Sequence, residues 1–160
     1  MKLYKPKFWE KKNNFISIIL SPLVFLVKIV IYFKRKFTRE INFKIPIICV
    51  GNIYIGGTGK TPISIFIAKE IQKAGKNPAI IRKYYRSHSD EHLLIKKYFS
   101  NLILDKSRIN GIKLSLKKGH DYAVLDDGFQ DYKIKKTISI LCFNQRQLIG
   151  NGLLFPAGPL

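Results

Sequence analysis

Residues 49–62 read Cys49-Val50-Gly51-Asn52-Ile53-Tyr54-Ile55-Gly56-Gly57-Thr58-Gly59-Lys60-Thr61-Pro62, and this stretch decides the fold. An apolar run precedes its glycines and an amphipathic segment follows them, which predicts a strand, a loop and a helix. Glycines in such a loop let backbone N–H groups converge on a phosphate at the helix N-terminus. A lysine ammonium suits the β- and γ-phosphates of ATP, and a following hydroxyl suits Mg²⁺. The predicted nucleotide-binding residues are Gly56, Gly57, Thr58, Gly59, Lys60 and Thr61.

The loop departs from the strict Walker A pattern. That pattern has a glycine five residues before Gly59, where this chain has Tyr54, and the adjacent Gly56 and Gly57 take its place. The alternative is a glycine-rich turn that happens to precede Lys-Thr. The strand pattern before the loop and the helix pattern after it favour nucleotide binding.

The composition indicates an anionic partner. The 160 residues include 29 Lys and Arg against 10 Asp and Glu, a formal net charge of +19. Nucleic acid, an acidic membrane surface or a phosphorylated substrate would each suit this charge. Codon usage in an AT-rich genome also favours lysine, and no nucleic-acid-binding motif accompanies the charge, so we expect no nucleic-acid partner. Cys49 and Cys142 lie in apolar runs without metal-ligand spacing, which predicts buried thiols.

A nearly continuous apolar segment occupies residues 15–33. As a single helix it would rise about 28 Å, close to the hydrocarbon thickness of a bilayer. Basic residues flank it on both sides, so it could span the membrane or lie in the inner leaflet. A buried core helix is the alternative. We predict that residues 1–40 form a membrane-associated helix with basic flanks.

The remaining chain, 41–160, predicts one α/β lobe. Apolar spacing over 63–74 indicates a helix, and 78–81 reads as a buried strand, so the unit implies a parallel sheet with flanking helices, as in P-loop NTPases. The apolar run 122–125 ends in Asp126 and Asp127. An acid in this place lies beside the nucleotide's Mg²⁺ in phosphate-loop proteins, although an Asp-Gly turn is the alternative.

These motifs together resemble the tetraacyldisaccharide 4′-kinase family. The resemblance covers the whole chain and rests on three motifs in order, which are 50–62, Asp126-Asp127-Gly128-Phe129-Gln130, and Gly150-Asn151-Gly152 with Pro156-Ala157-Gly158-Pro159. The family transfers the γ-phosphate of ATP to the 4′-hydroxyl of a lipid A disaccharide 1-phosphate precursor at the cytoplasmic face of the bacterial inner membrane. The resemblance thus implies this activity, ATP and Mg²⁺ as cofactors, and anionic inner-membrane lipids as partners.

The resemblance also implies roles for individual residues. Lys60 and Thr61 would hold the phosphates and Mg²⁺, and Asp126 and Asp127 would ligate the metal and organise catalysis. Asp90 matches the family's Asp-Glu motif and would accept the proton of the sugar hydroxyl. From spacing alone Asp90 fits a helix cap better, so its catalytic role depends on the resemblance.

Several features depart from the family. Arg82-Lys83-Tyr84-Tyr85 replaces its Arg-Gly-Tyr-Gly motif, and Asp131 stands where a histidine is usual. Family members are about twice as long, so this chain resembles their N-terminal half only. The alternative is a truncated, catalytically inactive remnant that retains membrane binding, with or without nucleotide binding. A membrane-bound ATPase switch is a third hypothesis, weakened because Ile55 stands where such proteins have a lysine.

Overall fold

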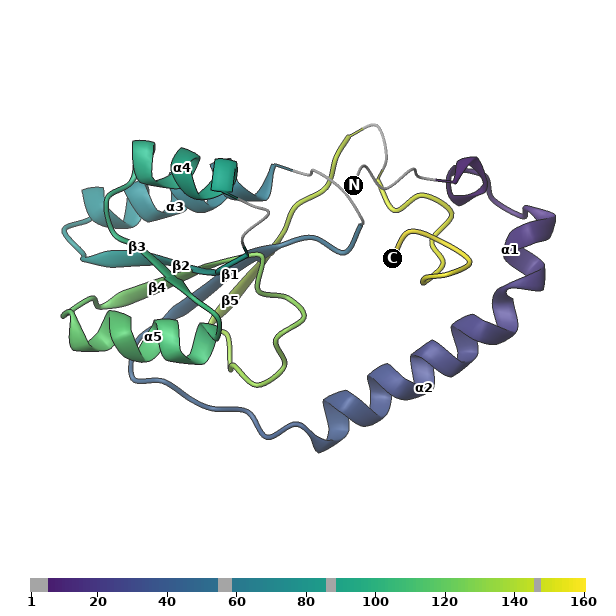
Figure 1. Cartoon of the computed structure of the whole chain (residues 1–160), viewed down its shortest axis with the longest axis horizontal. Helices are drawn as coiled ribbons and strands as arrows, with labels where there is room; N and C mark the ends of the chain where they lie inside the picture. Colours follow the sequence, from purple (N-terminus) through teal and green to yellow (C-terminus); the bar gives the residue numbers. More distant parts are fainter. Residues whose placement is uncertain (1–5, 55–58, 86–88, 146–147) are drawn as a thin grey trace. The chain divides into compact units, whose positions relative to one another are not determined.

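The computed structural model describes residues 6–54, 59–85, 89–145 and 148–160 (Figure 1). The contacts divide the chain into two compact units. The sheet unit comprises the described residues of 39–52 and 59–142. The helix–loop unit comprises residues 6–38, Ile53, Tyr54 and the described residues of 143–160. The described residues of 143–160 therefore belong to the same unit as the N-terminal helices.

A five-stranded parallel sheet forms the centre of the sheet unit, in the order β3-β2-β4-β1-β5. The strands are β1 (Ile47–Gly51), β2 (Pro78–Lys83), β3 (Leu102–Asp105), β4 (Tyr122–Asp126) and β5 (Ile138–Leu141). Because β4 lies between β1 and β2, the carboxyl ends of these three strands are adjacent, which is where ligands bind in open α/β sheets. The predicted α/β fold with a parallel sheet is confirmed.

Helices cover both faces of this sheet (Figure 1). Helix α3 (Lys60–Lys73) and helix α4 (Ser89–Tyr98) lie on one face, and α5 (Arg108–Lys117) lies on the other. Successive strand side chains point to opposite faces, so Ile80 packs with Ile65 of α3 and Ile95 of α4, whereas Ile81 packs with Ile112 of α5. Strands buried on both faces explain the continuous apolar runs in the sequence.

Both cysteines are buried in these cores, as predicted: Cys49 is 0% exposed and Cys142 is 4% exposed. Burial raises the pKa of the Cys49 thiol from 9.0 to about 11 and also raises the pKa of Cys142. Since the thiolate is the reactive form, we expect neither thiol to react with iodoacetamide at pH 8 in the folded chain, and both to react in urea. Mass spectrometry of the intact chain measures this. Labelling of the native chain would contradict the burial.

Because burial raises the pKa of Cys49, the folding stability of the chain depends on pH. Between about pH 9 and pH 11 the unfolded chain has lost the thiol proton and the folded chain keeps it. The stability contributed by the neutral thiol is therefore complete below pH 9 and declines as the pH rises towards 11.

The helix–loop unit corrects the prediction for the N-terminus. The apolar segment is not one helix, because the short 3₁₀ turn η1 (Lys7–Glu10) is followed by α1 (Phe15–Ile19) and, after a break at Leu20, by α2 (Ser21–Phe37). Pro22 lies in the first turn of α2, and proline there starts a helix and cannot continue a preceding one. Among the described residues, no helix combines the length and the apolar character needed to cross a membrane.

The glycine- and proline-rich loop near the end of the chain fastens the N-terminal helices within this unit. The indole Nε1 of Trp9 donates to the Pro156 carbonyl at 3.1 Å, and the buried hydroxyl of Ser17 donates to the Ala157 carbonyl at 3.0 Å. The Asn151 amide donates to the same Ala157 carbonyl at 2.9 Å. The third family-like motif therefore has a structural role, which is to hold α1 and η1.

Candidate nucleotide-binding site

The start of α3 has the backbone geometry that the glycine loop requires. Gly59 adopts φ +76° and ψ 18°, a left-handed conformation that glycine adopts at low cost, and α3 begins at the next residue. The predicted strand before the loop and the predicted helix after it are thus observed as β1 and α3. Gly56, Gly57 and Thr58 lie outside the described residues, so their contacts with a phosphate stay predictions.

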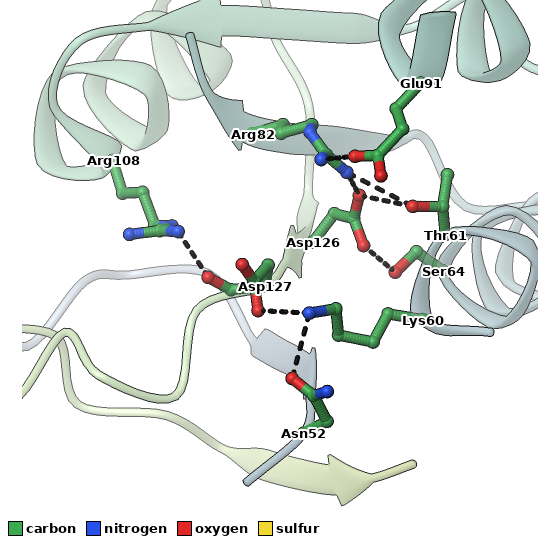
Figure 2. Close-up of polar contacts among 9 residues, drawn as sticks. All are labelled: Asn52, Lys60, Thr61, Ser64, Arg82, Glu91, Arg108, Asp126 and Asp127. Atoms are coloured by element: carbon green, nitrogen blue, oxygen red, sulfur yellow. Dashed lines mark hydrogen bonds and ion pairs between the residues drawn. The ribbon is translucent and has the colours of Figure 1, made fainter. Parts of the chain in front are cut away.

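Lys60 points towards the carboxyl ends of β1 and β4 (Figure 2). Its Nζ donates to the Asn52 Oδ1 at 2.9 Å and pairs with the Asp127 Oδ1 at 2.9 Å. The Lys60 side chain is 20% exposed and that of Asp127 is 49% exposed. An ammonium has three N–H donors, so these two contacts leave one for a further acceptor. Lys60 is therefore held in place at the strand ends and accessible to an anion.

Asp126 is the buried centre of the site, at 0% exposure. Its Oδ2 accepts from the Thr61 hydroxyl at 3.1 Å, and its Oδ1 accepts from the Ser64 hydroxyl at 3.0 Å. Thr61 and Ser64 are three residues apart on α3 and therefore project from the same side of the helix, towards the sheet. A buried carboxylate is costly unless it is hydrogen-bonded and paired with a cation, and the hydroxyls supply the first of these needs.

Arg82 supplies the cation. It lies near the end of β2, directly opposite Asp126 in the register of β2 with β4, and it is 6% exposed. Its Nη1 pairs with the Asp126 Oδ2 and donates to the Thr61 Oγ1 at 3.1 Å, and its Nη2 pairs with Glu91 on α4. One guanidinium therefore links three elements, β4, α3 and α4 (Figure 2).

The two adjacent carboxylates point in different directions. Asp127 has φ +63°, a left-handed conformation that is uncommon for residues other than glycine but several-fold enriched in aspartate. Its backbone N–H donates to the Val50 carbonyl at 2.8 Å, and its carbonyl accepts from Arg108. Asp126 contacts Thr61, Ser64 and Arg82, whereas Asp127 pairs with Lys60. The left-handed turn explains how neighbours in sequence have separate partners.

Asp90 is not part of this contact network. It is exposed and lies in the first turn of α4, where an acidic side chain interacts favourably with the helix dipole. Within the described ranges, the side-chain contacts of Lys60, Asp126 and Asp127 do not include Asp90. Its neighbour Glu91 makes the contact with the site instead. The catalytic role of Asp90 stays a prediction.

The sequence analysis assigned no site role to five residues of the network. They are Asn52, Ser64, Arg82, Glu91 and Arg108. Ser64 had a detectable signal, because it lies one helical turn after Thr61. Arg82 had a weaker one, at the end of a predicted strand. Asn52 and Glu91 follow only from the three-dimensional arrangement.

Thr61 and Asp126 supply oxygens of the kind that Mg²⁺ binds, and in this structure the Arg82 Nη1 contacts the same two oxygens. Mg²⁺ prefers oxygen ligands at about 2.0–2.1 Å in an octahedron, in which adjacent ligands lie about 2.9 Å apart. The Thr61 Oγ1 and the Asp126 Oδ2 are 3.1 Å apart, close to that separation. The residues that the structure describes contain no cluster of three or more His, Cys, Asp or Glu that could hold a metal. Two protein oxygens completed by water and phosphate oxygens are usual for Mg²⁺ in kinases.

The chain is similar to proteins of one family. Residues 16–160 match the family model described as Tetraacyldisaccharide-1-P 4'-kinase. The tetraacyldisaccharide 4'-kinase of Pelagibacter ubique is 43% identical over 164 residues, which cover 100% of this chain and 51% of that protein. That of Rickettsia bellii is 33% identical over 175 residues, covering 100% and 54%.

A solved structure agrees with these relatives. The crystal structure of LpxK from Aquifex aeolicus in complex with ATP has a TM-score of 0.73 and 25% identity, and the match covers 91% of this chain and 54% of that one. The chain therefore spans about half the length of the curated relatives that it matches.

Proposed function

Because the chain belongs to the tetraacyldisaccharide-1-P 4'-kinase family, we propose that it carries the ATP-binding half of a lipid A kinase. The enzyme would transfer the γ-phosphate of ATP to the 4′-hydroxyl of tetraacyldisaccharide 1-phosphate. One observation carries the proposal: Lys60, Thr61 and Asp126 meet at the carboxyl ends of adjacent parallel strands. The similarity to a structure in complex with ATP supports the same nucleotide here.

Each residue of the site has a task in phosphoryl transfer. The backbone N–H groups of 56–61 would bind the β-phosphate, and the Lys60 ammonium would bind the β- and γ-phosphate oxygens. Thr61 and Asp126 would hold Mg²⁺, which when bound neutralises charge on the phosphates. Positioning and charge neutralisation supply most of the catalysis in this reaction.

The contact between Lys60 and Asp127 implies that Lys60 would exchange this carboxylate for a phosphate when ATP binds. The ammonium holds two oxygens 2.9 Å away, from Asn52 and Asp127. A triphosphate carries more charge than one half-exposed carboxylate, so Lys60 would turn from Asp127 to the γ-phosphate. Asp127 would then face the reacting group. Asp90 would accept the proton of the 4′-hydroxyl, as the family's Asp-Glu motif implies.

The helix–loop unit suits the surface of an anionic membrane. Helices α1 and α2 expose large apolar side chains, and the last turn of α2 contains three consecutive basic residues, Lys34, Arg35 and Lys36. The exposed apolar residues include Phe15, Ile19, Phe25, Leu26, Val30, Phe33 and Phe37. Apolar contact with acyl chains and attraction to anionic lipid act together in such helices. We therefore place the protein at the cytoplasmic face of the bacterial inner membrane, where ATP and the lipid substrate meet.

Binding to vesicles checks the membrane proposal. Phe25→Ser removes an apolar side chain that is 65% exposed, and we expect about tenfold weaker binding to vesicles containing phosphatidylglycerol. Phe66→Ser on α3 is the matched control, with 62% exposure, and should bind as the parent chain does. Sedimentation with vesicles measures both. Equal binding by both variants, or no preference for anionic over neutral vesicles, would exclude this surface.

A direct assay tests the kinase proposal. The chain is incubated with Mg-ATP and vesicles containing tetraacyldisaccharide 1-phosphate, and the lipids are analysed by mass spectrometry for a 4′-phosphorylated product. Product formation supports the full proposal. ATP binding without product favours the alternative, a part that binds nucleotide and membrane but does not catalyse. If the chain has no affinity for Mg-ATP, the proposal fails.

A further inference from the structure

We propose that Arg82 and Glu91 form a positioning pair, which ties the start of α4, and with it Asp90, to the metal-binding end of β4. This inference rests on the proposed function. It assigns a task to a buried arginine that phosphate binding and metal binding do not require.

The two ends of the Arg82 guanidinium serve different elements. The Nη1 end lies against Asp126 and Thr61, and the Nη2 end lies against Glu91 (Figure 2). The guanidinium is planar and its N–H groups are fixed relative to one another, so the two ends cannot move independently. Fixing one end on Asp126 therefore fixes the place that the Glu91 carboxylate must occupy.

Charge neutralisation alone does not require Glu91. Asp126 is fully buried and already pairs with Arg82, so the buried positive charge is compensated before Glu91 is counted. The Glu91 side chain is 49% exposed, and a half-exposed ion pair contributes little to folding stability. What this second carboxylate provides is a tether from the first turn of α4 to a buried, well-fixed group.

The tether acts on Asp90 because the two residues are adjacent in the first turn of α4. Any displacement of the Glu91 backbone displaces Asp90 with it. A misplacement of about 1 Å in a reacting group can slow an enzyme by about a hundredfold. The pair would thus affect the rate of proton acceptance from the sugar hydroxyl and leave ATP binding nearly unchanged.

The test replaces Glu91 by glutamine, which keeps its size and removes its charge. We expect kcat to fall about tenfold or more, and the KM for ATP to stay within about twofold. Hydrogen exchange at the amides of 90–93 should become about tenfold faster, because local opening is no longer opposed by the pair. Glu91→Asp, which keeps the charge, should recover part of the rate.

Two controls isolate the pair. Glu70→Gln removes a carboxylate of similar exposure, 46%, that pairs with Lys73 on α3, and it should change neither the rate nor the exchange of α4. In an Arg82→Lys background, Glu91→Gln should lower kcat little further, because lysine lacks the planar guanidinium that joins Asp126 to Glu91.

The outcomes separate this inference from the proposed function. A fully active Glu91→Gln variant, or unchanged exchange at the start of α4, overturns the positioning pair. Equal losses in kcat, ATP affinity and melting temperature also overturn it, since they indicate a general structural role. If the parent chain forms no product, the kinase proposal fails separately, and the exchange measurement alone decides whether Glu91 holds α4.

Discussion

Lys60→Ala is expected to lower the rate of phosphoryl transfer by at least about a hundredfold and to weaken ATP binding, because it removes the only proposed ammonium at the phosphates. The Lys60 Nζ lies at the carboxyl ends of β1 and β4, held by Asn52 and Asp127. Its loss also leaves the half-exposed Asp127 carboxylate facing the phosphates, which adds repulsion. Product formation by mass spectrometry and ATP affinity by calorimetry measure the two effects.

Lys73→Ala is the matched control for this substitution. Lys73 lies on the same helix, in its last turn, where its side chain is 72% exposed and pairs with Glu70. Lys73→Ala removes one positive charge away from the site. The rate of phosphoryl transfer and the affinity for ATP should therefore stay within about twofold, because exposed ion pairs contribute little. If Lys60→Ala behaves like Lys73→Ala, the phosphates do not bind at the start of α3.

The sequence predicted the sheet because its signals are local. Buried strands appear as short apolar runs, and the helix after Gly59 has its own apolar spacing. The strand order has no local signal. It places β4 between β1 and β2, strands separated by many residues from β4, and only packing decides this order.

The site was predicted where a motif fixes the spacing and missed where the register fixes it. Lys60, Thr61 and Asp126 follow from the loop and from the end of an apolar strand. Arg82 belongs to the site because it lies opposite Asp126 across β2 and β4, and Glu91 belongs because α4 packs against α3 and Glu91 pairs with Arg82. Neither relation is visible in one sequence.

The prediction of one continuous helix over 15–33 was wrong for a related reason. Hydrophobicity over 15–33 indicates one long helix, but the pattern does not show that Ser21 and Pro22 start a new one. Ser17 is buried because it donates to Ala157, a residue 140 positions away. Contacts at such separations decide which apolar face is covered, and composition cannot reveal them.

Asp126→Ala is expected to destabilise the fold by about 3–5 kcal/mol, because it leaves the buried Arg82 guanidinium without its buried partner. Asp126 is 0% exposed and Arg82 is 6% exposed, so water cannot replace the lost carboxylate. The hydroxyls of Thr61 and Ser64 lose their acceptor as well. Urea denaturation measures the free energy of unfolding. A loss below about 1 kcal/mol would show that the buried pair of Asp126 and Arg82 contributes little to the stability of the fold.

A double variant separates stability from chemistry at this position. Asp126→Asn with Arg82→Gln removes both charges and keeps amide groups that can hydrogen-bond, so no unpaired charge is buried. We expect it to recover at least about half of the stability lost in Asp126→Ala, since replacing both partners of a buried pair costs less than removing one. An amide is a poor ligand for Mg²⁺ compared with a carboxylate, so the dependence of ATP binding on Mg²⁺ should still be lost. If the stable double variant keeps that dependence, Asp126 is a structural carboxylate, and the metal must bind elsewhere.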